Sequence, residues 1–152
     1  MKHINDNSLN TAGGIVLSNN KVLFIIKNDI WDLPKGKIGL NRTKLKTAKQ
    51  EIHEETGLRK KDLNTIKKLV PTYYFKNISG ELVLKKTTWY LFNYVGKTDV
   101  KLIPALEENI THCEWIDIKK INKVFENTHE RIKYILELFL IDYKNSKNWS
   151  KS

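Results

Sequence analysis

The sequence predicts an α/β fold of the α+β kind, in which a mixed central β-sheet carries helices on both faces. Runs rich in β-branched and aromatic residues alternate with stretches whose apolar residues recur at helical spacing. The expected order, β-β-loop-α-β-β-β-α-α, lacks the regular βαβ rhythm of a purely parallel sheet. With 152 residues, of which 40% are hydrophobic and 29% are charged, the chain has the composition of a globular domain.

The first two elements form a predicted β-hairpin. Residues 11–17 (TAGGIVL) and 21–27 (KVLFIIK) are apolar and rich in strand-forming residues, and the polar residues 18–20 between them are typical of a turn. Gly13 and Gly14 are unusual inside a strand, because glycine weakens strands. We therefore expect a bulge or a close backbone approach at this point.

A helix over residues 43–56 follows a loop over residues 28–41. Its core face consists of Leu45, Ala48 and Ile52, which recur at i, i+3 and i+7. Gly57 stands where a helix commonly ends with a residue of positive φ, so it is the expected end of this helix.

The second half of the chain completes the sheet and adds two helices. We expect strands over residues 66–76, 82–95 and 111–116, with a turn at 77–80 and a long loop at 97–109. A short helix over residues 118–124 precedes a longer one over 129–143, which residues 127–130 open as a capping box. The long helix has an apolar stripe: Ile132, Ile135, Leu136, Phe139 and Leu140.

The expected domain covers residues 11–144, with a flexible leader at 1–10 and a frayed tail at 145–152. The sequence contains no run of 18 apolar residues, so it predicts no transmembrane helix. The first ten residues are polar and lack the apolar segment of a secretory signal. The lone cysteine, Cys113, suits a reducing compartment. These features predict a cytoplasmic protein without a membrane partner, either a monomer or a homodimer.

The charge of the chain points to anionic partners. Lysine and arginine number 27 and aspartate and glutamate 17, which gives a net charge of +10. Residues 34–62 contain nine basic and four acidic residues, so half of the net charge lies in a fifth of the chain. Such a surface attracts nucleic acids, phosphorylated small molecules or acidic membranes. The alternative is a solvated, lysine-rich surface without a specific ligand.

Three carboxylates share one face of the helix predicted over residues 43–56. At 100° per residue, Glu54 lies about 60° to one side of Glu51 and Glu55 about 40° to the other. Like charges at these spacings destabilise a helix, so a positive group should offset them. A hard divalent cation, Mg²⁺ or Mn²⁺, prefers such oxygen ligands. The alternative is an ordinary amphipathic helix with a solvated acidic face.

The loop before this helix supplies complementary groups. Gly36 allows a tight backbone that turns a carbonyl toward the carboxylates, while Pro34 stiffens the entry to the loop. Lys35 and Lys37 flank that glycine and are candidates for binding phosphate.

This segment resembles the signature box of the Nudix hydrolases, G-x5-E-x7-R-E-U-x-E-E-x-G-U, in which U is a bulky aliphatic residue. Residues 36–58 have the required length of 23 and match seven of the nine specified positions. The Ala-Gly-Gly of the first strand, the Trp-x-Leu-Pro-Lys-Gly before the box and the acidic pair before the strand containing Trp115 are also similar. The resemblance thus covers most of the chain and implies a Nudix-like α/β/α sandwich.

Two positions depart from the box. Arg42 stands in place of its first glutamate and Gln50 in place of its arginine. In the family these two residues support each other and orient the catalytic carboxylates. Losing both members of such a pair is less damaging than losing one, which would strand a charge, and glutamine still donates and accepts hydrogen bonds. Arg42, however, puts a cation near the helix start, where the helix dipole disfavours it. We expect altered support of the metal site.

The resemblance implies attack of water on a phosphoanhydride bond, with Mg²⁺ or Mn²⁺ as cofactor. It assigns metal binding to the Gly36 carbonyl, Glu51, Glu54 and Glu55. Glu108, with Glu107 as runner-up, is a further candidate for metal binding or catalysis, and the alternative is a plain acidic loop. Which carboxylate takes the proton from water stays open.

The implied substrate is a nucleoside diphosphate linked to another group. The Pro-Lys-Gly-Lys sequence at residues 34–37 and the net charge resemble the branch of the family that acts on longer polyphosphates, such as dinucleoside polyphosphates. Lys85 is a further candidate for binding phosphate. The alternative function is a catalytically weakened module that binds a nucleotide without turnover. Nucleic-acid binding ranks last, because the sequence has no recognised RNA-binding motif.

Overall fold

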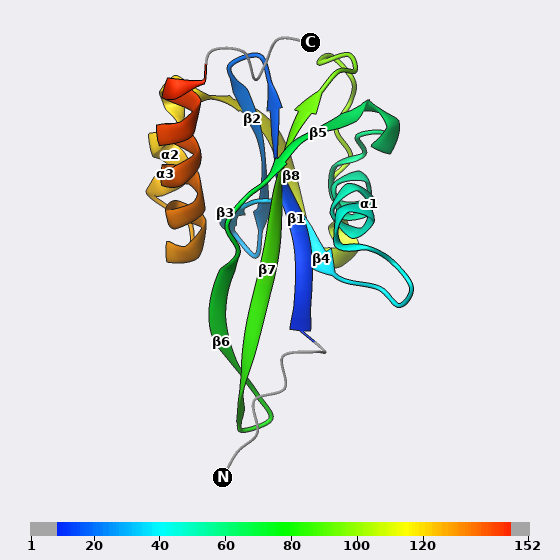
Figure 1. Ribbon diagram of the computed structural model, residues 1–152, viewed down its shortest axis with the longest axis vertical. Coiled ribbons are helices and arrows are strands. Elements are labelled where there is room, and N and C mark those ends of the chain that lie inside the picture. Colours follow the sequence, from blue (N-terminus) through cyan, green and yellow to red (C-terminus); the bar gives the residue numbers. More distant parts are fainter. Residues whose placement is uncertain (1–8, 147–152) are drawn as a thin grey trace.

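The structure is a computed structural model that describes residues 9–146. A mixed sheet lies between two helical layers, with α1 (Lys44–Thr56) on one face and α2 (Asn122–Phe125) and α3 (Glu130–Asn145) on the other (Figure 1). This arrangement confirms the predicted α/β/α sandwich. Residues 1–8 of the expected leader and 147–152 of the expected tail lie outside the described residues, and Asn10 already belongs to the first strand.

The sheet is built from eight strands among the described residues. They are β1 (Asn10–Ser18), β2 (Lys21–Lys27), β3 (Ile30–Asp32), β4 (Lys35–Lys37), β5 (Leu63–Lys68), β6 (Thr72–Ile78), β7 (Glu81–Tyr94) and β8 (Ile110–Asp117). The central path is β3-β2-β1-β7-β5, while β4 pairs with β1, β6 with β7 and β8 with β2. The β1–β7 pair is parallel and the other pairs are antiparallel, so the sheet is mixed as predicted.

Each face of the sheet has its own apolar core. On the α3 side, Ile132, Leu136 and Phe139 pack with residues of β1, β2 and β7, among them the fully buried Trp89. On the α1 side, Ala48 and Ile52 pack against the other face of the same strands. Because α1 is fixed through its apolar stripe, its acidic residues have defined directions.

The two glycines of β1 permit close approach of neighbouring segments. A side chain at Gly13 would overlap the backbone carbonyl of Pro34, and one at Gly14 would lie 2.6 Å from the Phe92 ring and 3.1 Å from Ile52. The Gly14 N–H also donates to the Pro34 carbonyl at 3.1 Å. Of the two explanations expected for these glycines, the structure supports the close approach.

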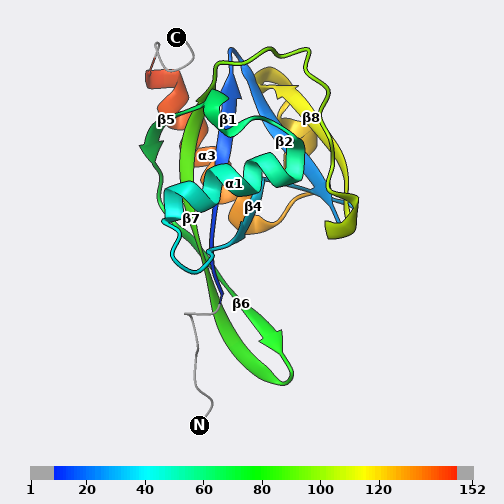
Figure 2. The same cartoon turned by 90° about the vertical axis from the view of Figure 1, so that its right-hand side faces the viewer.

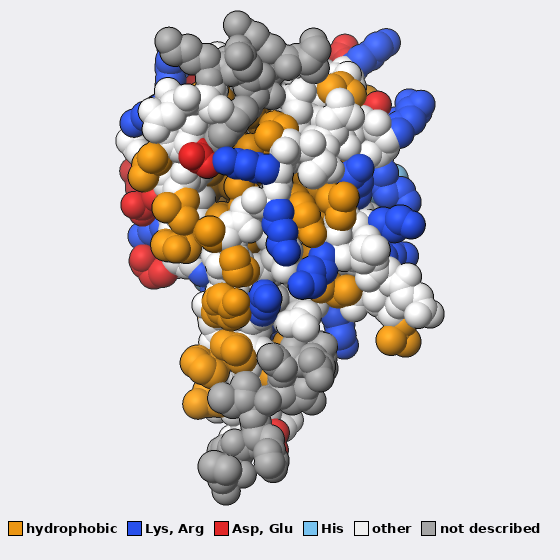
Figure 3. Space-filling view, in the orientation of Figure 1, with side chains coloured by type: hydrophobic (Ala, Val, Ile, Leu, Met, Phe, Trp, Pro, Cys, Tyr) orange, Lys and Arg blue, Asp and Glu red, His pale blue; other side chains and the backbone are white. Residues whose placement is uncertain are grey.

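A hairpin of β6 and β7 projects beyond the body of the molecule (Figure 2). Hydrophobic side chains follow this hairpin on the face shown in Figure 3. Four of its large hydrophobic residues are exposed: Tyr73, Phe75, Ile78 and Leu82. The turn predicted at residues 77–80 closes the hairpin, and there the Gly80 N–H donates to Asn77 Oδ1 at 3.0 Å.

Two predicted elements were wrong in their extent. The loop expected over residues 28–41 contains β3 and β4, because Asn28 and Asp29 adopt positive φ values of 51° and 65° and turn β2 directly into β3. The strand expected over residues 66–76 is two strands, β5 and β6, separated near Pro71, which has no N–H for the sheet. Both strands pair with successive parts of the long β7.

The capping box predicted at residues 127–130 is also wrong. The N-cap of α3 is His129, whose side chain makes no capping hydrogen bond. The Asn127 amide donates instead to the Asp29 carbonyl at 2.9 Å, and the Thr128 hydroxyl donates to the Trp31 carbonyl at 2.7 Å. These two side chains tie the start of α3 to the β2–β3 hairpin. None of the helices described in residues 9–146 is long and apolar enough to cross a membrane.

Candidate active site

A pocket of about 470 Å³ opens where α1, β4 and the loop before β8 meet. Its lining brings together most of the charged residues singled out in the sequence. Four lysines and four glutamates line it: Lys27, Lys35, Lys37, Lys85, Glu51, Glu54, Glu107 and Glu108. A pocket with both signs of charge can hold a cation and an anionic ligand side by side.

Helix α1 contributes the carboxylates of Glu51 and Glu54 to the lining of this pocket, while Glu55 lies buried next to it. Its start is fixed by Thr43, whose Oγ1 accepts from the Lys46 N–H at 3.1 Å, and its end by Gly57 at φ 82°. Glu55 is only 1% exposed, whereas Glu54 is exposed. The angular spacing explains the difference, because Glu55 is rotated toward the apolar stripe that contains Ile52 and Glu54 is rotated away from it.

Strand β4 brings its backbone against the same carboxylates. Gly36 pairs with Ala12 of β1, on the face that α1 covers. A side chain at Gly36 would overlap the carboxylate of Glu51, so glycine is the residue that leaves room for this carboxylate. The adjacent Lys35 N–H donates to Glu55 Oε1 at 3.2 Å.

Glu108 reaches the pocket from a 3₁₀ turn (η3, Leu106–Glu108) before β8. Buried Ala105 and Ile110 anchor this turn on either side, and the Ile110 N–H donates to the Ala105 carbonyl at 3.3 Å. Asn109 ends the turn at φ 63°. Glu107 lies on the same turn and also lines the pocket.

Glu51, Glu55 and Glu108 form a compact carboxylate cluster, with one oxygen of each lying within 4.8 Å of the others. Glu55 Oε2 is buried and has no hydrogen-bond partner among the described residues. A buried, unpaired carboxylate oxygen is costly unless a cation or a proton meets it. The donor set, three carboxylates beside a backbone glycine, fits a hard divalent cation such as Mg²⁺ or Mn²⁺.

The electrostatics of the cluster agree with a cation site. Burial raises the pKa of Glu55 to about 8, although the charges of Lys27 and Lys35 oppose this shift. Burial, followed by the negative charges of Glu54 and Glu108, raises the pKa of Glu51 to about 7. Without a cation the folded protein therefore holds these carboxyl groups partly protonated near neutral pH.

Glu54 lies at the rim of the pocket, outside the three-carboxylate cluster. Gln50 Nε2 donates to Glu54 Oε1 at 2.7 Å, and Lys60 Nζ donates to Gln50 Oε1 at 2.7 Å. The expectation that Gln50 both donates and accepts is confirmed. Arg42, the second departure from the box, is exposed, and its charge partly opposes the rise in the pKa of Glu51.

Sequence reasoning placed Lys35, Lys37 and Lys85 in the site, and all three line the pocket. It missed Lys27 and Thr11, which line the same pocket. Both lie on strands outside the box, and only the pairing of these strands brings them to the site. The sequence therefore carried no local signal for either residue.

Comparisons with known proteins agree with this geometry. The family model for the NUDIX domain matches residues 9–139. The RNA pyrophosphohydrolase of Pelagibacter ubique (strain HTCC1062) is 24% identical over 148 residues, which cover 84% of this chain and 92% of that protein.

Two solved structures share the fold. A bifunctional NMN adenylyltransferase/ADP ribose pyrophosphatase from Francisella tularensis, complexed with AMP and a manganese ion, gives a TM-score of 0.72 at 18% identity and covers 93% of this chain. The match spans 42% of that longer protein. The C. elegans Ap4A hydrolase, solved as a binary complex, gives a TM-score of 0.67 at 16% identity, with 90% of this chain and 99% of that chain covered.

Proposed function

The chain belongs to the NUDIX family of pyrophosphohydrolases, and from this premise we propose that it hydrolyses a phosphoanhydride bond in a nucleotide with a long polyphosphate chain. The observation that carries the proposal is the compact cluster of Glu51, Glu55 and Glu108, because Glu51 and Glu108 line a pocket that lysines also line. Carboxylates alone fit a cation, and lysines alone fit a phosphate. Their combination fits a phosphate chain bound to a cation.

Glu51, Glu55 and Glu108 would hold Mg²⁺ or Mn²⁺, with the Gly36 carbonyl as a further ligand. Such a cation, once bound, neutralises phosphate charge and makes water a better nucleophile. Glu54 also lines the pocket, with one oxygen held by Gln50, and we assign to it the role of accepting a proton from the attacking water. Lys27 and Lys35 counter the negative charge that the carboxylates and the substrate bring together.

The preference for a long polyphosphate rests on the number and spread of the lysines. Lys35, Lys37 and Lys85 line the pocket from two different strands, β4 and β7. A diphosphate bound at the cation would meet only part of this set, whereas a chain of three or four phosphates spans more of it. Fold neighbours include an Ap4A hydrolase, which is consistent with a dinucleoside polyphosphate substrate.

A second candidate substrate is the 5′ end of an RNA that carries a polyphosphate. The curated relatives include RNA pyrophosphohydrolases, and the projecting hairpin carries exposed Tyr73 and Phe75, with the Lys86 ammonium 5.9 Å from the centroid of the Tyr73 ring. Aromatic rings beside basic residues are the means by which proteins hold single-stranded nucleic acids. This observation favours RNA more strongly than the charge of the chain does by itself.

The test is product release from a panel of ADP-ribose, nucleoside triphosphates, dinucleoside tetraphosphates and 5′-triphosphorylated RNA, with Mg²⁺, with Mn²⁺ and with a chelator. We expect turnover that requires the cation and is highest for one long polyphosphate class. Glu51→Gln and Glu108→Gln should each lower kcat by at least 100-fold. Glu137→Gln, an exposed position on α3, is the matched control and should act as the parent does.

Two outcomes would contradict the proposal. Full activity in Glu108→Gln, together with a loss in Glu107→Gln, would move the site to the neighbouring carboxylate. A panel with no turnover, combined with cation-dependent nucleotide binding, would support the alternative of a binding module without catalysis.

A further inference from the structure

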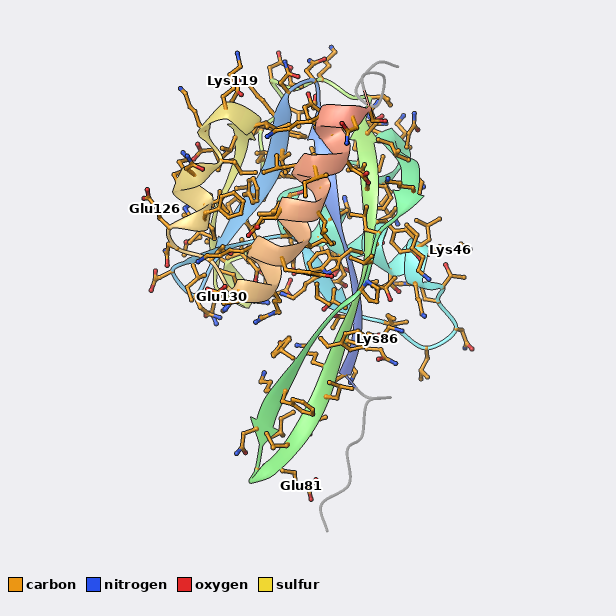
Figure 4. The ribbon with its side chains drawn as sticks, turned by 60° about the vertical axis from the view of Figure 1, so that its left-hand side comes forward. Lys46, Glu81, Lys86, Lys119, Glu126 and Glu130 are labelled. Atoms are coloured by element: carbon orange, nitrogen blue, oxygen red, sulfur yellow. The ribbon has the colours of Figure 1, made fainter. Side chains whose placement is uncertain are left out.

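A group of basic side chains surrounds Tyr74 on the α3 side of the sheet, on the face opposite to the carboxylate cluster. Arg131, in the first turn of α3, stacks on the Tyr74 ring with its guanidinium carbon 3.7 Å from the ring centroid. Lys85 lies opposite Tyr74 in the β6–β7 register, and its ammonium is 5.8 Å from the same centroid. In Figure 4 the first turn of α3, marked by Glu130, stands at the level of the hairpin root, where Lys86 is labelled.

Lys85 connects this group to the pocket of the candidate active site. Gly36 faces α1, and Lys35 beside it in β4 points to the opposite face because successive strand residues alternate. Lys35 and Lys85 both line the pocket. The pocket lined by Glu51 and Glu108 therefore extends to Lys85. The Lys85 ammonium lies over the Tyr74 ring against which Arg131 packs, so Arg131 adjoins the pocket at this end.

Among the described residues, the positive charges of Arg131, Lys85 and Lys35 are not balanced by an equal number of paired carboxylates. Asp32 is buried and pairs with Lys35, with Nζ and Oδ2 3.2 Å apart, but no carboxylate in residues 9–146 forms an ion pair with Arg131 or Lys85. Arg131 Nε is buried and has no hydrogen-bond partner among those residues. Stacking on Tyr74 uses the face of the guanidinium and leaves the N–H donors in its plane available to an acceptor.

Positive charges near this group also lower the pKa values of Lys85 and His129. Burial lowers the pKa of Lys85, the neighbouring Tyr74 opposes this shift, and the charges of Lys35 and Lys76 add to it. Burial likewise lowers the pKa of His129, the N-cap of α3; the charge of Arg131 adds to this shift and the charge of Asp32 opposes it. The charge of Lys35 lowers the pKa of both groups.

We propose that Arg131 and Lys85, arranged around Tyr74, form a phosphate subsite that holds a substrate phosphate remote from the cleaved bond. The proposal rests on the proposed function, since it extends the same pocket. Arg131 is a specificity residue in this assignment, because it binds a phosphate that does not react. An arginine in a rigid stack is well suited to this task, as its fork of donors matches the oxygens of a phosphate.

Two sources can supply this phosphate. One is the far end of a polyphosphate chain whose near phosphates lie at the carboxylate cluster. The other is the first internucleotide phosphate of an RNA whose 5′ end occupies that cluster. The chemistry of recognition is the same in both cases, so the substrates of the test must separate them.

The first experiment measures binding of inorganic tripolyphosphate by calorimetry in the presence of a chelator, which removes the cation from consideration. We expect Arg131→Gln and Lys85→Gln each to weaken binding about tenfold, the factor typical for the loss of a charged hydrogen-bond donor. Arg131→Lys should recover part of the loss. Lys133→Gln removes one charge from the same helix about 200° away from Arg131, and it should bind as the parent does.

The second experiment measures kcat and KM of Arg131→Gln on ADP-ribose, a dinucleoside tetraphosphate and 5′-triphosphorylated RNAs of one, two and four nucleotides. We expect KM to rise about tenfold while kcat stays unchanged, because the residue touches no reacting atom. A rise in KM for the tetraphosphate but not for ADP-ribose would show that the subsite binds the far end of a polyphosphate chain. A rise only for RNAs of two or more nucleotides identifies the internucleotide phosphate.

The subsite and the proposed function fail in different ways. Unchanged tripolyphosphate affinity in a folded Arg131→Gln protein, or no binding by the parent, would overturn the subsite even if the enzyme is active. Arg131-dependent binding of tripolyphosphate by a protein that hydrolyses none of the panel would uphold the subsite and overturn the proposed function. Thermal unfolding of each variant shows whether it is folded, and Lys85→Gln provides an independent test should Arg131→Gln unfold.

Discussion

Gln50 and Glu54 lie one helical turn apart on α1 and are joined by a hydrogen bond of 2.7 Å from Nε2 to Oε1. Lys60 Nζ donates in turn to Gln50 Oε1. A positive charge therefore still acts on Glu54, although it is one residue further away than an arginine at position 50 would place it. Glutamine at position 50 therefore changes how the Glu54 carboxylate is oriented, but Glu54 keeps a hydrogen-bond donor and a nearby positive charge.

Gln50→Ala should lower kcat several-fold and leave the fold intact. The substitution releases Glu54 and interrupts the path from Lys60, but all three side chains are at the surface, where such bonds contribute about 1 kcal/mol or less to stability. Steady-state kinetics together with urea unfolding measure the two effects.

Gln50→Arg tests the same relationship from the other side. Arginine has no acceptor for the Lys60 ammonium, so the single variant sets two cations against each other. Combining it with Lys60→Ala should relieve this repulsion and give higher activity than Gln50→Arg alone. Equal activity of the single and the double variant would show that Lys60 does not act through position 50.

Gly36→Ala should impair cation binding far more than stability. The added methyl group would overlap the Glu51 carboxylate, which lies at the end of a flexible side chain and can move aside at little cost to the fold. Moving it, however, disperses the cluster with Glu55 and Glu108. We expect at least a tenfold weaker Mn²⁺ affinity in calorimetry and a shift in unfolding free energy of about 1 kcal/mol or less.

Gly39→Ala is the matched control for this variant. A methyl group there meets nothing within 4 Å, and the position has no positive φ. It should bind Mn²⁺ as the parent does. A similar loss of affinity in both alanine variants would contradict the role given to Gly36.

The glycines of β1 should show the opposite pattern. Gly14→Ala forces a methyl group against the Phe92 ring and Ile52 in a packed core, for which we expect about 1–3 kcal/mol of destabilisation. Gly13→Ala should destabilise more, because its methyl group meets the Pro34 carbonyl, a backbone atom that cannot rotate away. Urea unfolding of the two variants gives the comparison, and a more stable Gly13→Ala protein would contradict it.

Local pattern predicted the parts of the site that lie on one helix. The spacing of Glu51, Glu54 and Glu55 placed all three near the pocket, and the position of Ile52 on the same helix explains why Glu55 is buried and Glu54 is not. The helix boundaries at Thr43 and Gly57 also follow from local capping chemistry.

The rest of the site depends on contacts between distant segments. Glu108 reaches the cluster because Ala105 and Ile110 are buried in the core, and Arg131 reaches Tyr74 because α3 packs beside the hairpin. The resemblance to the Nudix hydrolases singled out Glu108 through its acidic pair, but no sequence pattern marks Arg131. Asn127 and Thr128 also depend on a distant segment. They resemble a helix cap in sequence, but in the structure their side chains donate hydrogen bonds to the β2–β3 hairpin.

Removal of the cation should make stability fall as pH rises. The pKa of Glu55 is about 8 in the folded protein and near its ordinary value of 4.5 in the unfolded chain. The folded state therefore binds a proton more tightly, so this contribution to stability is fully present below about pH 4.5 and is lost as pH rises through about 8. Glu51, with a pKa raised to about 7, adds a contribution of the same sign.

Urea unfolding with a chelator between pH 5 and 9 measures this slope, and Glu55→Gln should flatten it because glutamine does not titrate. Added Mn²⁺ should reverse the trend, since the cation binds the deprotonated carboxylates and stabilises the folded state more as pH rises. A chelated protein whose stability increases over this range, or a Glu55→Gln protein with the slope of the parent, would show that the buried carboxyl group is not held in its protonated form.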